Sequence, residues 1–383
     1  MRILLISSKW PTTTQEIDGG CMTAQNVLDA IVENSCVDLL LPEGYKDTEI
    51  SGINKTYFYP VNEEIIENYN GKNKFLCRIK IAKIVASIVL GIYSDYDRII
   101  ILHAFHSFTI CNGNYVSLQN KVILFPMLLT PAYIDSGEDV PDIYTKYEKN
   151  ALQNVRTIIT PSIYEYEQIK NFFNVISDKI TIIPRFVGNE FEYVEQDSFY
   201  PIKLNICYIA SIKKQKQNLE AAKLLHQLSK KLPNCFLYIV GPIHDEFEFD
   251  NLINYIHDYG LCDKVSIIQQ MSQSEVNKLF SICFANISVA RCETFGRAII
   301  EGLYCGLPAF VLNETKCFKT LIGNNHGVIY SNSYEEMANQ IIEIYNSPQK
   351  YKEMRTQARH FGVRYEENKI KPILKQTILC KVN

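Results

Sequence analysis

The sequence predicts two α/β domains in tandem, each built on a parallel sheet with helices on both faces. Short apolar runs recur along the 383 residues, and stretches with helical periodicity separate many of them. Runs without polar alternation are typical of strands that helices bury on both sides. The pattern starts again after about residue 195, and the chain is long for one hydrophobic core but comfortable for two.

Six apolar runs predict the strands of the first domain, and helical patterns between several of them predict crossover helices. The predicted strands are residues 3–8 (ILLISS), 36–42 (CVDLLLP), 98–104 (RIIILHA), 121–128 (KVILFPML), 156–162 (RTIITPS) and 179–185 (KITIIPR). The predicted helices lie at about 22–34, 74–93 and 141–155.

Five further runs predict the second sheet. They are residues 204–210 (LNICYIA), 235–241 (CFLYIVG), 264–270 (KVSIIQQ), 283–289 (CFANISV) and 307–313 (LPAFVLN). The polar, aromatic stretch at 192–201 is the predicted linker. A charged helix is expected at about 347–361, and Pro372 is expected to kink or break the segment that follows it.

Composition excludes several classes of protein. The net charge of −3 gives no basic field that would recruit nucleic acid. The twelve cysteines form no Cys-x-x-Cys pair, which favours buried free thiols in a reducing compartment. The sequence contains no run of 18 apolar residues, so it predicts no membrane span. The N-terminal stretch MRILLISS is too short for a signal peptide. We therefore expect a cytoplasmic globular protein.

The stretch ETFGRAIIEGLYCGLP, residues 293–308, is the strongest local signal. Glu293 and Glu301 stand eight positions apart, with a helix start at Gly296 between them. A helix entered through glycine presents free N–H groups and a positive dipole end, which suit a phosphate. Eight helical residues would span about 12 Å, the reach from a sugar to a ribose across a diphosphate. Alternatively, Glu293 is a helix-start acid and Glu301 an ordinary solvated or paired residue.

Two other loops follow predicted strands, where open α/β sheets bind ligands. After the first strand, Gly19 and Gly20 open a helix and allow the backbone close to an anion, although the loop is no GxGxxG fingerprint. After the strand at 204–210, Lys213, Lys214 and Lys216 are placed to neutralise a diphosphate. A flexible turn and a solvated lysine run are the alternatives.

Two histidines follow the strand at 98–104. Either His103 or His106 can donate to a sugar hydroxyl or to a developing charge, whereas a structural role is the alternative for both. Their spacing also suits a metal, but no cysteine or third histidine lies near them in sequence, so no metal site is predicted.

A basic amphipathic stretch covers residues 72–92. Its cations have no acid among them: Lys72, Lys74, Arg78, Lys80 and Lys83. Such a helix can lie on an anionic membrane surface, which predicts a possible peripheral contact with the inner face of a membrane. A core-packed helix with its lysines in water is the preferred interpretation.

Successive motifs resemble one family along most of the chain. They are YIASIKKQKQNLEAAKLL, FLYIVGP, LCDKVSIIQQMSQSEVNKLF, ISVARCETFGRAIIEGLYCGLP and NHGVIYSN, concentrated in residues 204–331, with a looser match in the first half. They are similar to GT-B glycosyltransferases of family 4, the "glycosyl transferases group 1" type. The resemblance implies two Rossmann-like domains facing each other across a cleft: 1–197 for the acceptor, 203–361 for the nucleotide sugar, and a helix at 362–383 crossing back.

The resemblance also implies residue roles. His106, Glu293 and Lys216 would be catalytic, with His103 as the alternative to His106, and both histidines near the acceptor. The donor-binding set would be Gly19, Gly20, Lys213, Lys214, Lys216, Glu293, Thr294, Phe295, Gly296 and Glu301, with Glu301 on the ribose. Relatives retain anomeric configuration and need no metal or other cofactor. The resemblance therefore implies two substrates and no cofactor: a nucleotide sugar, most often a UDP-sugar, as the donor, and a saccharide or lipid-linked acceptor.

Three departures from the family pattern accompany this resemblance. The usual Gly-Arg pair before the lysines is Ala210-Ser211, so Lys213 or Lys214 would have to replace the arginine. Residues 289–292 (VARC) and 313–319 (NETKCFK) also differ from the family's usual sequence near the sugar. The predicted function is hexose transfer in polysaccharide or glycoconjugate synthesis. A non-catalytic GT-B protein that binds a nucleotide sugar or a partner glycosyltransferase is the alternative, and a dehydrogenase is disfavoured.

Overall fold

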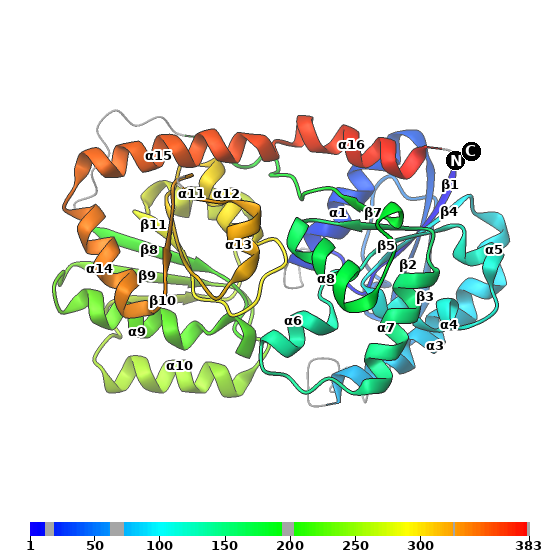
Figure 1. The fold of residues 1–383 in the computed structure, drawn as a ribbon, viewed down its shortest axis with the longest axis horizontal. Helices are drawn as coiled ribbons and strands as arrows, with labels where there is room; N and C mark the ends of the chain where they lie inside the picture. Colours follow the sequence, from blue (N-terminus) through cyan, green and yellow to red (C-terminus); the bar gives the residue numbers. More distant parts are fainter. Residues whose placement is uncertain (12–18, 62–72, 194–202, 325, 381–383) are drawn as a thin grey trace. The chain divides into compact units, whose positions relative to one another are not determined.

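The computed structural model describes residues 1–11, 19–61, 73–193, 203–324 and 326–380. These residues form two compact units (Figure 1). Unit 1 comprises the described residues of 1–15, 19–184 and 370–383, and unit 2 comprises 185–369. The sequence-based domain bounds stay a prediction. Part of the expected linker, residues 194–201, and Lys72 of the basic stretch lie outside the described residues.

Unit 1 is built on a seven-stranded sheet whose strand pairs are all parallel. Its order is β3-β2-β1-β4-β5-β6-β7. The strands are β1 (Arg2–Ile6), β2 (Cys36–Pro42), β3 (Lys55–Tyr59), β4 (Arg98–Leu102), β5 (Val122–Phe125), β6 (Thr157–Thr160) and β7 (Ile180–Ile182). The α-helices are α1 (Gly19–Ile31), α3 (Lys74–Ile92), α4 (Phe108–Asn112), α5 (Val116–Gln119), α6 (Thr130–Asp135), α7 (Asp142–Asn154) and α8 (Ile163–Phe173).

Unit 2 repeats this plan with a six-stranded sheet in the order β10-β9-β8-β11-β12-β13. Its strands are β8 (Leu204–Ile209), β9 (Cys235–Val240), β10 (Val265–Ile268), β11 (Ala285–Ser288), β12 (Ala309–Leu312) and β13 (Val328–Ser331). Its helices are α9 (Asn218–Ser229), α10 (Glu246–Asp258), α11 (Gln273–Ile282), α12 (Arg297–Tyr304), α13 (Lys316–Leu321), α14 (Tyr334–Tyr345) and α15 (Pro348–Gly362). All of its strand pairs are parallel as well.

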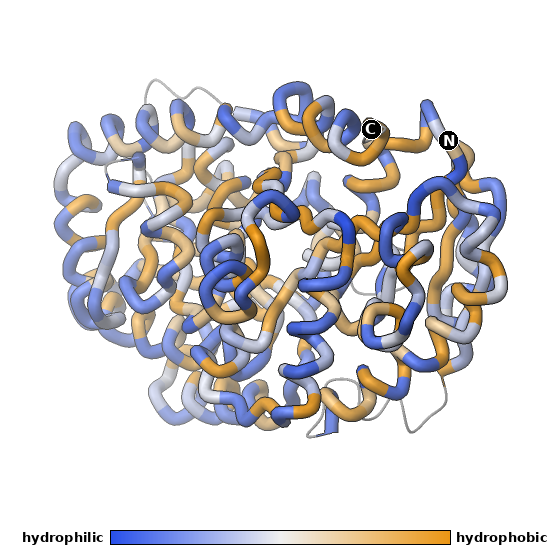
Figure 2. Tube along the Cα trace, turned by 45° about the vertical axis from the view of Figure 1, so that its right-hand side comes forward, coloured by the Kyte–Doolittle hydropathy of each residue, from blue (hydrophilic) through white to orange (hydrophobic). Residues whose placement is uncertain are grey.

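Each unit has its own hydrophobic core. The central strands are almost continuously apolar because helices cover both faces of each sheet. Hydrophobic stretches of the chain are orange in Figure 2. The last helix, α16 (Glu367–Leu379), continues through Pro372, so the expected break does not occur there. Its later residues belong to unit 1, where Lys375 lies 3.9 Å from Glu33.

The strand orders also define where a ligand site belongs. In unit 1 the order reverses between β1 and β4, and in unit 2 it reverses between β8 and β11. Ligands of open α/β sheets bind beyond the carboxyl ends of the strands at such a switch point. The glycines after β1, the histidines after β4, the lysines after β8 and Glu293 after β11 all follow these four strands.

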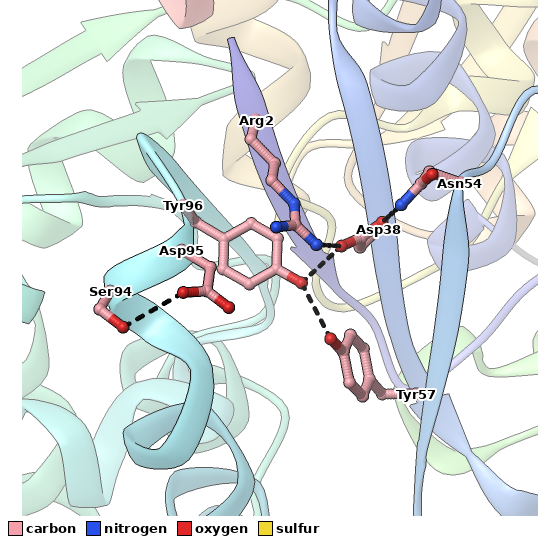
Figure 3. A network of polar contacts seen from close by, with 7 residues as sticks. All are labelled: Arg2, Asp38, Asn54, Tyr57, Ser94, Asp95 and Tyr96. Carbon is pink, nitrogen blue, oxygen red and sulfur yellow. Dashed lines mark hydrogen bonds and ion pairs between the residues drawn. The ribbon is translucent and has the colours of Figure 1, made fainter.

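A buried charge network lies at the opposite, amino-terminal edge of the unit 1 sheet (Figure 3). Asp38 of β2 is fully buried and accepts hydrogen bonds from Arg2 (2.9 Å), Tyr96 (2.6 Å) and Asn54 (2.7 Å). Burial raises the pKa of Asp38, but the hydrogen bonds from Tyr96, Asn54 and Arg2 outweigh it and hold the pKa below 3.8. Because this edge is remote from the switch point, we assign the network to stability.

Candidate active site

Two loops of unit 2 carry most of the predicted donor residues. The lysine loop, residues 213–217, follows β8, and the glutamate loop, residues 289–296, follows β11. These strands are neighbours in the sheet, with Cys207 of β8 opposite Asn286 of β11. The parallel sheet therefore brings the two loops side by side at its carboxyl edge, although they are far apart in sequence.

An ion pair joins the two loops. Lys216 Nζ donates to Glu293 Oε1, and the two side chains are only 16% and 21% exposed. An ammonium group here can stabilise a departing phosphate, and a carboxylate can accept a hydrogen bond from a sugar hydroxyl. In the structure each group is the counterion of the other, an arrangement that the sequence did not predict.

The other two lysines lie on the same loop. Lys213 is half-buried in extended backbone, and Lys214 is exposed at the start of the 3-10 turn Lys214–Lys216. Ser211 lies just before this loop and is half-buried. The substitution of Lys213 or Lys214 for the family's arginine therefore stays a prediction.

Gly296 makes the entry to α12. Its φ of 70° and ψ of 54° are left-handed, and a Cβ on it would overlap the Phe318 ring. Because α12 begins only at Arg297, residues 293–296 are not helical. The expectation that an eight-residue helix separates Glu293 from Glu301 is wrong, and the 12 Å estimate does not apply.

Two further predicted donor residues precede this helix start. Thr294 is half-buried, and Phe295 is buried with its ring edge on Tyr365, at a centroid distance of 5.7 Å. Phe295 thus packs the glutamate loop against Tyr365, in the 3-10 turn after α15. No acidic side chain lies in the first turn of α12, so the dipole end stays attractive to an anion.

Glu301 lies inside α12 and is not solvated. It is 6% exposed, and Arg297, one turn earlier, lies 3.6 Å from it. Burial raises the pKa of Glu301 to about 7, against the opposing charge of Arg297. Within the described part of the chain, neither Glu301 Oε1 nor Arg297 Nη2 has a hydrogen-bond partner. A ligand hydroxyl, which both donates and accepts, would satisfy both atoms.

The structure speaks against a catalytic role for His106. Its side chain is fully buried, Nδ1 donates to the Leu102 carbonyl (2.7 Å), and Nε2 lies 3.4 Å from the Tyr59 hydroxyl. Burial lowers its pKa to about 4, so it stays neutral at physiological pH. A histidine that faces a substrate needs an accessible ring nitrogen, so we correct the choice of His106 and keep His103.

His103 directly follows β4 and has an unusual backbone conformation. Its φ is 74°, which non-glycine residues rarely adopt, and its N–H donates to the Phe125 carbonyl (2.8 Å). The ring is half-buried, with Nδ1 3.4 Å from the Ser8 hydroxyl, just beyond β1. Strained backbone of this kind is often retained at functional sites. Ser8 was missed in the sequence, where it only ends the first apolar run.

Gly19 and Gly20 are the first residues of α1. Gly19 is exposed, and a Cβ on it would meet no atom within 4 Å, so its surroundings in unit 1 do not require glycine. The first turn of α1 contains no acidic residue, which leaves its amino end suited to an anion. The loop that leads into it, residues 12–18, lies outside the described residues.

The basic stretch packs largely as a core helix. Lys74 pairs with Glu138, and Arg78 donates to the Tyr133 hydroxyl (2.6 Å), whereas Lys80 is exposed on α3. The contact of residues 72–92 with a membrane stays a prediction. None of the helices in the described ranges has the length and apolarity that a membrane crossing requires. Nor do three or more His, Cys, Asp or Glu side chains of those ranges gather as metal ligands would.

Comparison with known proteins shows what the chain is similar to. Residues 191–361 match the family model "Glycosyl transferases group 1". The probable sucrose-phosphate synthase of Thermosipho melanesiensis is 21% identical over 325 residues, 77% of this chain and 75% of that protein. The α-1,3/1,6-mannosyltransferase ALG2 of Dictyostelium discoideum is 26% identical over 97 residues, only 25% of this chain and 23% of that protein.

Solved structures show the same fold over the whole length. A sucrose-phosphate synthase from Thermosynechococcus elongatus has a TM-score of 0.79 at 14% identity and covers 98% of both chains. Anabaena HepE in complex with UDP-glucose has a TM-score of 0.75 at 15% identity and covers 99% of both chains. The chain therefore has the GT-B fold, and its residues 191–361 match the glycosyl transferases group 1 family of glycosyltransferases.

Proposed function

We propose that this glycosyltransferase moves a hexose from a UDP-sugar to a saccharide or lipid-linked acceptor, with retention of configuration and without a metal ion. The observation that carries the proposal is the Lys216–Glu293 pair beside the left-handed entry to α12. A cation and a helix start on one edge of the sheet suit a diphosphate, and the carboxylate between them suits the attached sugar.

Each of these residues is proposed to bind a different part of the donor. Lys216 and the N–H groups from Phe295 to Arg297 bind the diphosphate, Glu293 accepts from a sugar hydroxyl, and Glu301 accepts from the ribose. Transfer breaks the bond from the anomeric carbon to the phosphate oxygen and joins that carbon to an acceptor hydroxyl oxygen. The hydroxyl proton goes to the departing diphosphate, whose charge Lys216 stabilises. We assign the histidine role to His103.

The choice of UDP is supported by HepE, whose structure contains UDP-glucose. A panel of UDP-, GDP-, ADP- and dTDP-sugars, with nucleotide release followed without and with saccharide acceptors, tests the donor. Release from UDP-sugars is the expected result. If none of the donors releases nucleotide, the chain is a binding protein and the proposed transfer is refuted.

Variants of the ion pair test the assignment of roles. Lys216→Ala should lower kcat/KM about 10²-fold or more, the scale of losing one preorganised charge. Glu293→Gln should lower turnover without weakening UDP binding, whereas Glu301→Ala should weaken UDP binding itself. Lys278→Ala removes an exposed lysine of α11 as the matched control. Equal UDP affinity of the Glu293 and Glu301 variants in calorimetry would contradict this division.

A further inference from the structure

We propose that Arg291 and Gln217 form a bracket that holds Lys216 in place, so that both are positioning residues for sugar transfer. The inference rests on the proposed function, because Lys216 must act on the departing diphosphate for its position to matter. It adds two residues to which the sequence assigned no role.

The bracket consists of contacts between the lysine loop and the glutamate loop. With its side-chain amide oriented to suit its neighbours, Gln217 donates to the Val289 carbonyl (2.7 Å) and accepts from Arg291 Nε (2.8 Å). The backbone N–H of Arg291 donates to the backbone carbonyl of Gln215 (3.0 Å). One arginine thus holds the residues on both sides of Lys216.

Lys216 itself is held at both ends. Its carbonyl accepts from the hydroxyl of Tyr208, a residue of β8 that is buried, and its ammonium donates to Glu293. Three consecutive residues of the loop, 215–217, are therefore tied to β8 or to the glutamate loop. Fixing a lysine side chain in one rotamer costs conformational entropy. Because these contacts fix Lys216 before the substrate binds, that entropy cost does not add to the activation free energy of the reaction.

The backbone of Gln217 shows why such a bracket is required. Its φ of 51° and ψ of 46° are left-handed, a conformation that is unfavourable for a residue with a side chain. The two side-chain hydrogen bonds of Gln217 hold it in this conformation, which ends the 3-10 turn Lys214–Lys216 and begins α9. If these bonds were lost, the turn that carries Lys216 could relax.

A second role for Arg291 has to be distinguished. The side chain is exposed, and its Nε is the atom that binds Gln217, so its terminal nitrogens are a possible direct contact for a phosphate. A direct contact depends on charge, which lysine preserves. The bracket depends on the Nε donor next to the planar guanidinium, which lysine lacks.

The test compares steady-state kinetics and UDP affinity across a small set of variants. Arg291→Ala, Arg291→Lys and Gln217→Ala should each lower kcat about tenfold, because a displaced ammonium loses part of its transition-state stabilisation. The dissociation constant of UDP should rise by a smaller factor than kcat falls, since the N–H groups from Phe295 to Arg297 and Glu301 still contact the nucleotide. Lys278→Ala is the control for the loss of one exposed cation from unit 2.

The decisive measurement repeats Arg291→Ala and Gln217→Ala in a Lys216→Ala background. If both residues act through Lys216, neither change lowers kcat further in that background. A full tenfold loss there, or full activity in Arg291→Lys, would show that Arg291 acts on the substrate directly and overturn the bracket. Unchanged kcat in the single variants would overturn it as well.

Two controls separate this inference from its premises. Circular dichroism and thermal unfolding show whether each variant folds, and Arg291→Lys and Gln217→Ala carry the test if Arg291→Ala does not. A wild-type chain without activity toward any nucleotide sugar would refute the proposed function. An active wild type with unaffected bracket variants would refute the bracket alone.

Discussion

The buried carboxylate of Glu301 makes the stability of unit 2 depend on pH. Its pKa rises from an ordinary 4.5 to about 7 because burial disfavours the charged form. Between these values the folded chain holds a proton that the unfolded chain has lost, so the free energy of unfolding falls as pH rises. A shift of this size corresponds to on the order of 3 kcal/mol, lost between about pH 4.5 and pH 7.

Glu301→Gln isolates this contribution. The variant also changes the contact with Arg297, so the absolute difference from wild type is not informative. The change of that difference with pH is informative, and it should move by on the order of 3 kcal/mol in favour of the variant from pH 4.5 to pH 7. Glu353→Gln, which removes an exposed glutamate of α15, is the control.

The assay has to report unit 2. The only tryptophan, Trp10, is buried in unit 1, so its fluorescence follows the wrong unit. Urea unfolding by far-UV circular dichroism follows both units, and the fluorescence transition then identifies the part that belongs to unit 1. A difference between wild type and Glu301→Gln that stays constant from pH 4.5 to pH 8 would refute the reasoning.

Two further predictions concern unit 1. Asp38→Asn should cost about 1–3 kcal/mol at pH 7, because Arg2 and Tyr96 lose a charged acceptor. Since folding lowers the pKa of Asp38, its contribution exists above the unfolded pKa of about 3.9 and disappears as pH falls, so urea unfolding should show the two chains converging near pH 3. His103→Asn should lower turnover about 10²-fold with little change in Tm, whereas His106→Ala should lower Tm. The reverse pattern in kinetics and thermal unfolding would restore His106 as the candidate.

The sequence predicted the interior strands well because two-sided burial leaves an apolar run that can be recognised directly. Of the four edge strands it predicted β7 and β10 but not β3 and β13. The two missed strands are partly exposed, and their sequences, KTYFY and VIYS, mix polar and aromatic residues. An edge strand is covered less completely, so selection for a continuous apolar run is weaker there.

The candidate site was predictable at the level of loops but not at the level of side chains. The strands can be recognised in the sequence, so the glycines, lysines and histidines that follow their ends can be located as well. Whether His103 or His106 is accessible depends on the backbone after β4, where His103 and Ala104 continue to pair with Phe125 and Pro126. That pairing turns His106 into the core, and nothing in the spacing of the two histidines indicates it.

On the proposed function, the Lys216–Glu293 pair also changes how the site attracts its donor. Because the two charges cancel, the attraction for a diphosphate has to come from the start of α12 and from the cations around it, such as Lys213 and Lys214. An arriving phosphate competes with Glu293 for Lys216, and a displaced Glu293 is free to accept from the sugar. Glu293→Gln removes that competition, which is why we expect it to lower turnover while UDP affinity holds or rises. Phosphate binding and sugar recognition are thus coupled through one ammonium group, and the precision with which the loop holds Lys216 sets the strength of that coupling.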